Sequence, residues 1–150
     1  MSYCFGIDIG GTTVKCGLFT TEGVLLEKWE IKTRTEENGK AILPDVAETI
    51  LKKMEEKEIT REEAVGIGIG LPGPIEENGE IACAVNLHWG RKNVEKELEE
   101  LTGMPVKAGN DANVAALGEM WKGGGKGAKN LILATLGTGV GGGIIINEKI

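Results

Sequence analysis

The sequence predicts a mixed α/β fold, and three observations support this prediction. Strand-like and helix-like segments alternate along the 150 residues. The strand-like segments are short apolar runs that end at glycine turns. The helix-like segments repeat apolar residues with the helical period and carry charges on the opposite face. The expected order is β-β-β-α-β-α-β-α followed by a β-hairpin, which is typical of mixed α/β domains.

The first half of the chain begins with three strands, expected over residues 3–10, 13–20 and 24–33, which short turns join into a meander. A helix is expected over residues 41–58, with Pro44 in or near its first turn. Its apolar face contains seven residues at helical spacing, namely Ile42, Leu43, Val46, Ala47, Ile50, Leu51 and Met54.

The apolar run over residues 64–75 is expected to form a buried central strand that ends in a Pro-Gly-Pro turn. After an extended excursion, a short helix carries three apolar residues on one face and ends at Gly103. These three residues are Val94, Leu98 and Leu101. A strand then leads into a helix that opens near Asp111, and the last 20 residues read as strand, glycine turn and strand.

The composition argues against several classes of protein. The net charge of -6, without a dense lysine and arginine block, argues against a nucleic-acid partner. The sequence contains no apolar run near the roughly 20 residues that a membrane span needs. Cys4, Cys16 and Cys83 are odd in number and lack a C-x-x-C spacing. No signal peptide is recognised, so we expect reduced thiols in a cytoplasmic protein, and we expect no zinc site.

The glycine run near the end of the sequence matches the dinucleotide-binding pattern G-x-G-x-x-G at Gly137, Gly139 and Gly142. That pattern requires a helix directly after the turn. The residues that follow include three consecutive isoleucines, 144–146, which favour a strand. An NAD site is therefore a poor interpretation. Two interpretations stay open for this run taken alone: a phosphate-binding backbone nest and a flexible hairpin loop.

A second glycine turn lies near the start of the sequence, over residues 6–15. It combines a buried strand, two glycines, hydroxyl side chains and a lysine, at Gly10, Gly11, Thr12, Thr13 and Lys15. Asp8 adds a carboxylate to the otherwise apolar strand. A hydrated Mg²⁺ beside phosphates would give this carboxylate a partner. The alternative is that Asp8 caps the turn amides or pairs with Lys15.

The third candidate is Asp111, which lies where a strand gives way to a helix, between Asn110 and Asn113. Any one of these residues could serve only as a helix N-cap. Capping does not explain three such residues within four positions. The positive end of the helix favours a charged carboxylate, so Asp111 is a candidate general base that accepts a proton from a substrate hydroxyl.

Five ordered blocks give the sequence a family resemblance. They are "FGIDIGGTTVKCGLF", "GLPGPI", "NLHWG", "GNDANVAALGE" and "TLGTGVGGGIII". In order and spacing they resemble the ROK family of sugar kinases and related repressors, and within it the bacterial ATP-dependent glucokinases. The resemblance implies the actin-like ATPase (ribonuclease H-like) fold, in which two α/β domains close on nucleotide and sugar.

The resemblance also implies roles for individual residues. The first phosphate loop would comprise Asp8, Gly10, Gly11, Thr12 and Lys15, with Asp8 near Mg²⁺. The second phosphate hairpin would comprise Gly137, Thr138, Gly139 and Gly141, so that the two loops hold ATP. Asp111 would be the catalytic base, and the sugar ligands would be Gly73, Asn86, Asn110 and Asp111. We expect Trp89 to pack in the core or at the rim rather than stack on sugar, and His88 to lie in a surface loop.

The sequence departs from the family pattern in its length. Family members run to about twice this length and carry an E-x-G-H sugar segment and a Cys/His zinc site, which this sequence lacks. We therefore expect the first half of a kinase that is inactive by itself. It would comprise an actin-like domain over 1–122, a glycine-rich hinge over 123–130 and the first hairpin of a truncated second domain over 131–150.

The resemblance leaves the exact sugar open, although glucose fits best, and we expect a homodimer. A sugar-responsive regulator of the same family is the alternative function. Such repressors carry a DNA-binding module ahead of the D-x-G-G-T block, and only seven residues precede Asp8. An actin-like or chaperone-type ATPase is a third hypothesis, but it would not need the sugar-side blocks.

Overall fold

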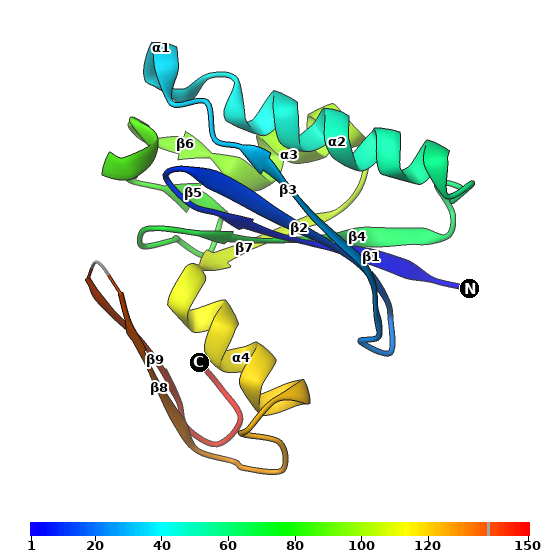
Figure 1. Cartoon of the computed structure of the whole chain (residues 1–150). Helices are drawn as coiled ribbons and strands as arrows, with labels where there is room; N and C mark the ends of the chain where they lie inside the picture. Colours follow the sequence, from blue (N-terminus) through cyan, green and yellow to red (C-terminus); the bar gives the residue numbers. More distant parts are fainter. Residues whose placement is uncertain (138) are drawn as a thin grey trace. The chain divides into compact units, whose positions relative to one another are not determined.

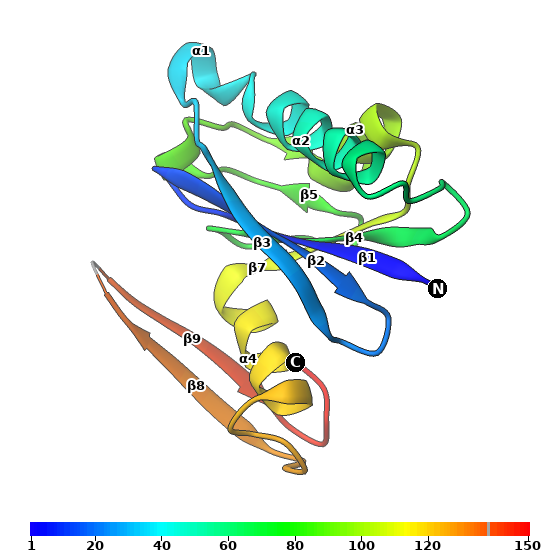
Figure 2. The ribbon, with the colours of Figure 1, turned by 45° about the vertical axis from the view of Figure 1, so that its right-hand side comes forward.

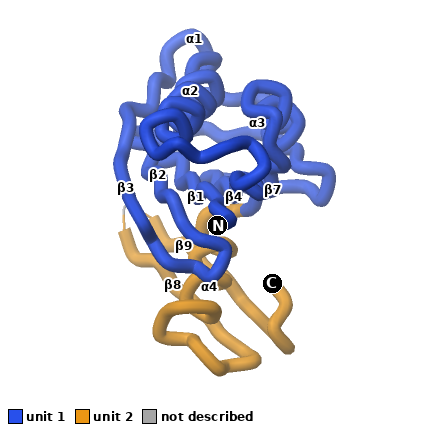
Figure 3. Tube along the Cα trace, turned by 90° about the vertical axis from the view of Figure 1, so that its right-hand side faces the viewer, with its two compact units in different colours: residues 1–109 blue, residues 110–150 orange. Residues whose placement is uncertain are grey.

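The computed structural model describes residues 1–137 and 139–150. Thr138, one of the predicted phosphate-binding residues, lies outside the described residues. The chain forms two compact units, residues 1–109 and residues 110–150 (Figure 3). Residues 123–130 consist of turns and bends between the last helix and the last two strands. Their role as a hinge stays a prediction.

A five-stranded mixed sheet organises the first unit. Its strands are β1 (Tyr3–Ile9), β2 (Thr13–Thr20), β3 (Leu25–Lys32), β4 (Ala64–Leu71) and β7 (Val106–Asn110). The order across the sheet is β3-β2-β1-β4-β7. Strands β1, β2 and β3 pair antiparallel and form the predicted meander, whereas β1 and β4 pair parallel. The expected mixed α/β fold is confirmed, with β4 as an interior strand of the sheet.

Two helices, α2 (Ile42–Glu56) and α3 (Val94–Thr102), cover one face of this sheet (Figure 1). Six of the seven predicted face residues of α2 are buried, and Leu51 is 42% exposed. In α3, Val94 and Leu98 are buried as predicted, but Leu101 is 41% exposed. Thr102 is buried instead, and its hydroxyl donates to the Leu98 carbonyl at 2.8 Å. The buried face of α3 therefore follows the i, i+4 line, and the prediction for Leu101 was wrong.

Short elements lie in the connections between the predicted strands and helices. They are α1 (Glu36–Gly39), β5 (Glu80–Ile81), the 3₁₀ turn η1 (Val85–Leu87) and β6 (Lys92–Asn93). Strands β5 and β6 pair antiparallel. Gly103 ends α3 in the left-handed conformation, with φ 69°, as predicted.

The second unit contains α4 (Asp111–Lys122) and the hairpin of β8 (Leu131–Leu136) and β9 (Val140–Ile145). The hairpin lies along α4 (Figure 2). Gly143 permits this packing, since a Cβ there would lie 2.6 Å from the Cβ of Ala116. The glycine turn runs into strand β9 and not into a helix, so the prediction of a strand after the glycine run is confirmed. No helix in the described part of the chain is long and apolar enough to cross a membrane.

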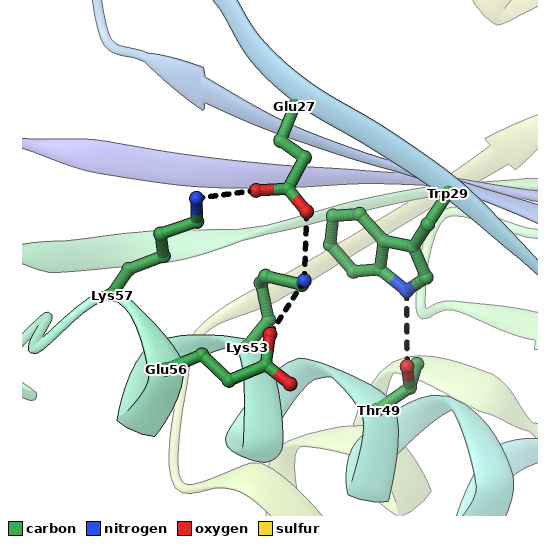
Figure 4. Close-up of polar contacts among 6 residues, drawn as sticks. All are labelled: Glu27, Trp29, Thr49, Lys53, Glu56 and Lys57. Carbon is green, nitrogen blue, oxygen red and sulfur yellow. Dashed lines mark hydrogen bonds and ion pairs between the residues drawn. The ribbon is translucent and has the colours of Figure 1, made fainter.

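Charged side chains join β3 to α2 (Figure 4). Lys53 Nζ lies 2.8 Å from Glu27 Oε1 and 2.7 Å from Glu56 Oε2, and Lys57 Nζ lies 2.6 Å from Glu27 Oε2. Beside them, Trp29 Nε1 donates to Thr49 Oγ1 at 3.0 Å. The hydrogen bonds from the Lys53 and Lys57 ammonium groups lower the pKa of Glu27 from 4.5 to about 2.

We expect Glu27→Gln to flatten the acid dependence of stability. A carboxyl whose pKa is lower in the folded state stabilises the fold above its unfolded pKa, and this contribution is lost as pH falls from about 4.5 towards about 2. Thermal unfolding measured from pH 5 to pH 2 should therefore show a smaller decline in Tm for this variant than for the wild type. Glu22→Gln, at an exposed glutamate in the β2–β3 turn, is the control. Equal declines in Tm for Glu27→Gln and wild type would contradict the expectation.

Candidate functional site

The predicted first phosphate loop is the tight link between β1 and β2. Gly10 N donates to the Thr13 carbonyl at 3.0 Å and closes the turn. Gly11 and Thr12 are exposed at its tip. Within residues 1–137 and 139–150, no protein group accepts a hydrogen bond from the amides of Gly11 and Thr12. The loop therefore presents two backbone donors to a ligand from the surrounding solution, as an anion-binding turn requires.

Asp8 and Lys15 flank this loop from the two strands. They are directly opposite each other in the antiparallel register, so their side chains leave the same face of the sheet. Asp8 lies in the predicted strand but is exposed, although the sequence predicted this strand to be buried. The buried residues of β1 are its alternate neighbours Phe5, Ile7 and Ile9, and the strand periodicity turns Asp8 to the other face. The pairing of Asp8 with Lys15 therefore stays an open alternative to a metal role.

Gly73 lies at the same edge of the sheet as the loop. Strands β1 and β4 run parallel, with Asp8 opposite Gly70, so the turn after Leu71 and the turn after Ile9 leave the sheet on one side. Gly73 N donates to the Leu71 carbonyl at 3.0 Å. A Cβ at Gly73 would lie 3.0 Å from the Cys83 carbonyl oxygen, so the absence of a side chain allows this close approach.

Asn86 comes from η1 and lies against the phosphate loop. A Cβ on Gly11 would lie 3.3 Å from the Asn86 Cβ and 3.4 Å from its carbonyl oxygen. The first unit therefore brings one predicted sugar ligand next to one predicted phosphate-loop residue, although 75 positions separate them in the sequence.

The segment that carries Asn86 is fixed by its neighbours Trp89 and His88. Trp89 is 4% exposed and belongs to the core, which confirms the prediction of packing over sugar stacking. Its Nε1 donates to the Gly39 carbonyl at 3.0 Å. His88 is exposed, as predicted for a surface loop, and its Nδ1 lies 3.1 Å from the Thr35 carbonyl oxygen. Both contacts tie this segment to the connection between β3 and α2.

Asp111 is the first residue of α4, and Asn110 is its N-cap. The Asn110 Oδ1 accepts from Ala112 N at 3.1 Å and from Asn113 N at 3.3 Å. Asp111 Oδ1 accepts from Ala112 N at 2.8 Å. Among the described residues, no donor reaches Asp111 Oδ2. The capping function thus falls to Asn110, and Asp111 keeps one carboxylate oxygen available for a substrate proton.

The second predicted phosphate loop joins β8 to β9. Gly137 N donates to the Gly139 carbonyl at 2.9 Å, and a Cβ at either glycine would meet no atom within 4 Å. Gly141 N donates to Thr135 Oγ1 at 3.1 Å. A Cβ at Gly141 would lie 2.5 Å from that hydroxyl oxygen, so a larger residue there would displace the Thr135 hydroxyl. Thr135 was not among the predicted site residues, because a threonine is inconspicuous within an apolar strand.

Two groups of candidate residues result. One lies within residues 1–109 and contains Asp8, Gly10, Gly11, Thr12, Lys15, Gly73 and Asn86. The other lies within residues 110–150 and contains Asn110, Asp111, Gly137, Gly139 and Gly141. Within the described ranges, no three His, Cys, Asp or Glu side chains form a cluster that could hold a metal ion. A single exposed carboxylate beside a phosphate loop still suits Mg²⁺, which takes few protein ligands and keeps several waters.

Cys16 and Cys4 do not belong to either group of candidate residues, and burial suppresses the reactivity of their thiols. Burial raises the pKa of the Cys16 thiol to about 12 and also raises the pKa of Cys4. Both side chains are therefore protonated at neutral pH, and neither is a ready nucleophile or thiolate ligand.

Comparisons with known proteins agree with this geometry. The sequence matches the ROK family over residues 4–150. It is 48% identical to a glucokinase of Halalkalibacterium halodurans over 97% of this chain and 44% of that protein. It is 31% identical to a xylose repressor of Bacillus spizizenii over 99% of this chain and 38% of that protein.

The solved structures include a ROK family glucokinase from Streptomyces griseus in complex with glucose and AMPPNP. It superposes with a TM-score of 0.85 at 32% identity, over 99% of this chain and 46% of that chain. The chain thus spans less than half the length of each of these three proteins.

Proposed function

The chain belongs to the ROK family, and we propose that it is the N-terminal part of an ATP-dependent hexose kinase. The intact kinase transfers the γ-phosphoryl group of ATP to a hexose. Glucose is the proposed substrate and glucose 6-phosphate the product, in line with the similarity to glucokinases. Residues 123–130 would act as the hinge between a first domain, 1–122, and a second domain that begins at 131.

In this proposal the two glycine loops hold the phosphates of ATP. The amides of the exposed residues Gly11 and Thr12 donate to phosphate oxygens, and Lys15 adds a positive charge beside them. Gly137, Thr138, Gly139 and Gly141 would supply the second phosphate loop. Asp8 would hold hydrated Mg²⁺, which would offset phosphate charge.

The sugar is held by Gly73, Asn86 and Asn110, and Asp111 is the catalytic base. The Asp111 carboxylate accepts the proton of the sugar hydroxyl as that oxygen attacks the γ-phosphorus. Positioning of the two reactants and electrostatic stabilisation of the transferred phosphoryl group supply most of the remaining rate enhancement. We further propose that the kinase is cytoplasmic, in line with its free cysteines, and that it forms a homodimer, as the family resemblance implies.

The contact between Gly11 and Asn86 is the observation that carries this proposal. A phosphotransferase must hold its phosphate donor and its acceptor next to each other, and here a phosphate-loop residue lies against a sugar-side residue. A chaperone-type ATPase needs the phosphate loops but not the sugar-side segment. A regulator of the same family would use the sugar segment without turnover, and the xylose repressor similarity keeps this as the second candidate.

The proposal can be tested with a chimaera in which this chain replaces the matching segment of the Halalkalibacterium halodurans glucokinase. We expect the chimaera to produce ADP in a manner that depends on both ATP and glucose, and the 150-residue chain alone to show no appreciable turnover. The unaltered glucokinase and circular dichroism of the chimaera are the controls for assay and folding. A folded chimaera that binds glucose without turnover would favour the regulator, and robust turnover by the chain alone would contradict the expected incompleteness.

A further inference from the structure

Thr33, directly after β3, makes two hydrogen bonds to the first phosphate loop. Its hydroxyl Oγ1 donates to the Gly10 carbonyl at 2.7 Å, and its backbone N donates to the Thr12 carbonyl at 2.9 Å. The residue is 4% exposed, one of the few buried polar residues in the described part of the chain. It occupies no position in the family resemblance.

The hydrogen bond from the Thr33 hydroxyl to the Gly10 carbonyl controls the direction of the Gly11 N–H, which donates to phosphate in the proposed function. The peptide unit between Gly10 and Gly11 is planar and trans, so its carbonyl and its N–H point in opposite directions. A carbonyl that points at the Thr33 hydroxyl therefore makes the Gly11 amide point away from Thr33. Gly11 N–H is one of the two amides for which the described residues offer no acceptor.

Other bonds fix the neighbouring peptide planes but not this one. Gly10 N, bonded to the Thr13 carbonyl, belongs to the preceding peptide unit, and the Thr12 carbonyl belongs to a later one. Both residues that border the plane are glycines, which have no Cβ to restrict its rotation. The same glycines that let an anion approach the backbone would thus leave the plane free to turn.

We propose that Thr33 is a positioning residue, whose hydroxyl orients the Gly10–Gly11 peptide so that the Gly11 amide binds a phosphate oxygen of the nucleotide. This inference rests on the proposed function for the identity of the ligand. It adds a residue from a third segment of the chain to the machinery of the first phosphate loop.

Nuclear magnetic resonance of the 150-residue chain tests the inference with Mg²⁺ and AMPPNP as the probe. Thr33→Val removes the hydroxyl at nearly constant volume, and Thr33→Ser retains it, while both keep the backbone bond to Thr12. We expect the Gly10 carbonyl carbon resonance to shift in Thr33→Val and to stay near its wild-type position in Thr33→Ser. On titration, the Gly11 amide should respond in wild type and Thr33→Ser, and affinity should fall about tenfold in Thr33→Val, since a hydrogen bond to a charged group is weakened.

Thr102→Val is the matched control, because it removes another buried hydroxyl bonded to a backbone carbonyl, within α3. It should leave the response of Gly11 to the probe unchanged. If Thr33→Val fails to fold, Thr33→Ala takes its place and is compared with Thr33→Ser.

Three results would overturn the inference. The first is a Thr33→Val chain that binds the probe with wild-type affinity and shows an unchanged Gly10 carbonyl resonance. The second is a wild-type chain in which the amides of Gly139 or Gly141 respond but Gly11 does not, which would leave nucleotide binding standing without a role for Thr33. The third is the absence of any response in wild type, which would remove nucleotide binding by the first phosphate loop of this chain and with it the role of Thr33, whereas the function of the longer kinase is tested separately by the chimaera.

Discussion

Replacement of Asp111 by asparagine is expected to lower the kcat of the chimaera by about 10²–10⁴, the range that a general base contributes. The amide keeps the shape of the carboxylate and an oxygen that can accept from Ala112 N, as Asp111 Oδ1 does at 2.8 Å. It has no basicity towards a sugar hydroxyl. The cap of α4 is also retained, because Asn110 accepts from Ala112 and Asn113. The fall in kcat should therefore leave Tm close to that of the unaltered chimaera.

Steady-state kinetics with glucose and ATP varied in turn provide the measurement. Glu119→Gln is the control, because it removes one negative charge from the same helix at an exposed position near its other end. It should leave kcat within a small factor. Near-normal turnover by Asp111→Asn, or an equal loss in Glu119→Gln, would reject Asp111 as the base.

Local sequence patterns were sufficient to predict the elements that frame the site. The helical spacing from Ile42 to Met54 predicted α2, and the three consecutive isoleucines after the glycine run predicted a strand where a dinucleotide site needs a helix. The helical spacing of apolar residues was less reliable for predicting which residues at the edge of a helix face are buried. Leu101 has the spacing of a buried residue, yet α3 packs along the line of Val94, Leu98 and Thr102.

The candidate residues themselves were predictable only in part. The glycine loops and Asp111 could be found because each lies in a short stretch whose residue types conflict with a plain strand or helix. Thr135 could not, because a threonine is inconspicuous within an apolar strand. Thr33 and Gly39 could not, because their importance comes from partners far along the chain. Thr33 contacts Gly10, 23 positions away, and Gly39 contacts Trp89, 50 positions away. A threonine after a strand and a glycine at the end of a short helix are ordinary until those partners are known.

Gly39→Ala should destabilise the chain by roughly 2–5 kcal/mol, the largest stability effect that we expect from a single added methyl group. Gly39 has φ +64°, which L side chains rarely adopt. A Cβ would overlap the Leu87 carbonyl oxygen and lie 2.7 Å from Trp89 Nε1. The methyl group must therefore displace the segment that carries Asn86, or break the Trp89 bond to the Gly39 carbonyl.

Gly103→Ala separates the penalty of the left-handed backbone conformation from the steric overlap of the added methyl group. Gly103 has φ +69°, but the nearest atom to an added Cβ, Arg61 Nε, is 3.9 Å away, so only the backbone penalty of about 1–2 kcal/mol applies. Urea unfolding of both variants gives the two free energies, and their difference measures the steric contact around Gly39. In the chimaera, Gly39→Ala should also raise the KM for glucose more than Gly103→Ala, since Asn86 shares a segment with Leu87 and Trp89. Equal free energies of unfolding in the two variants would contradict the close contact of Gly39 with Leu87 and Trp89, and equal KM values would separate that contact from sugar binding.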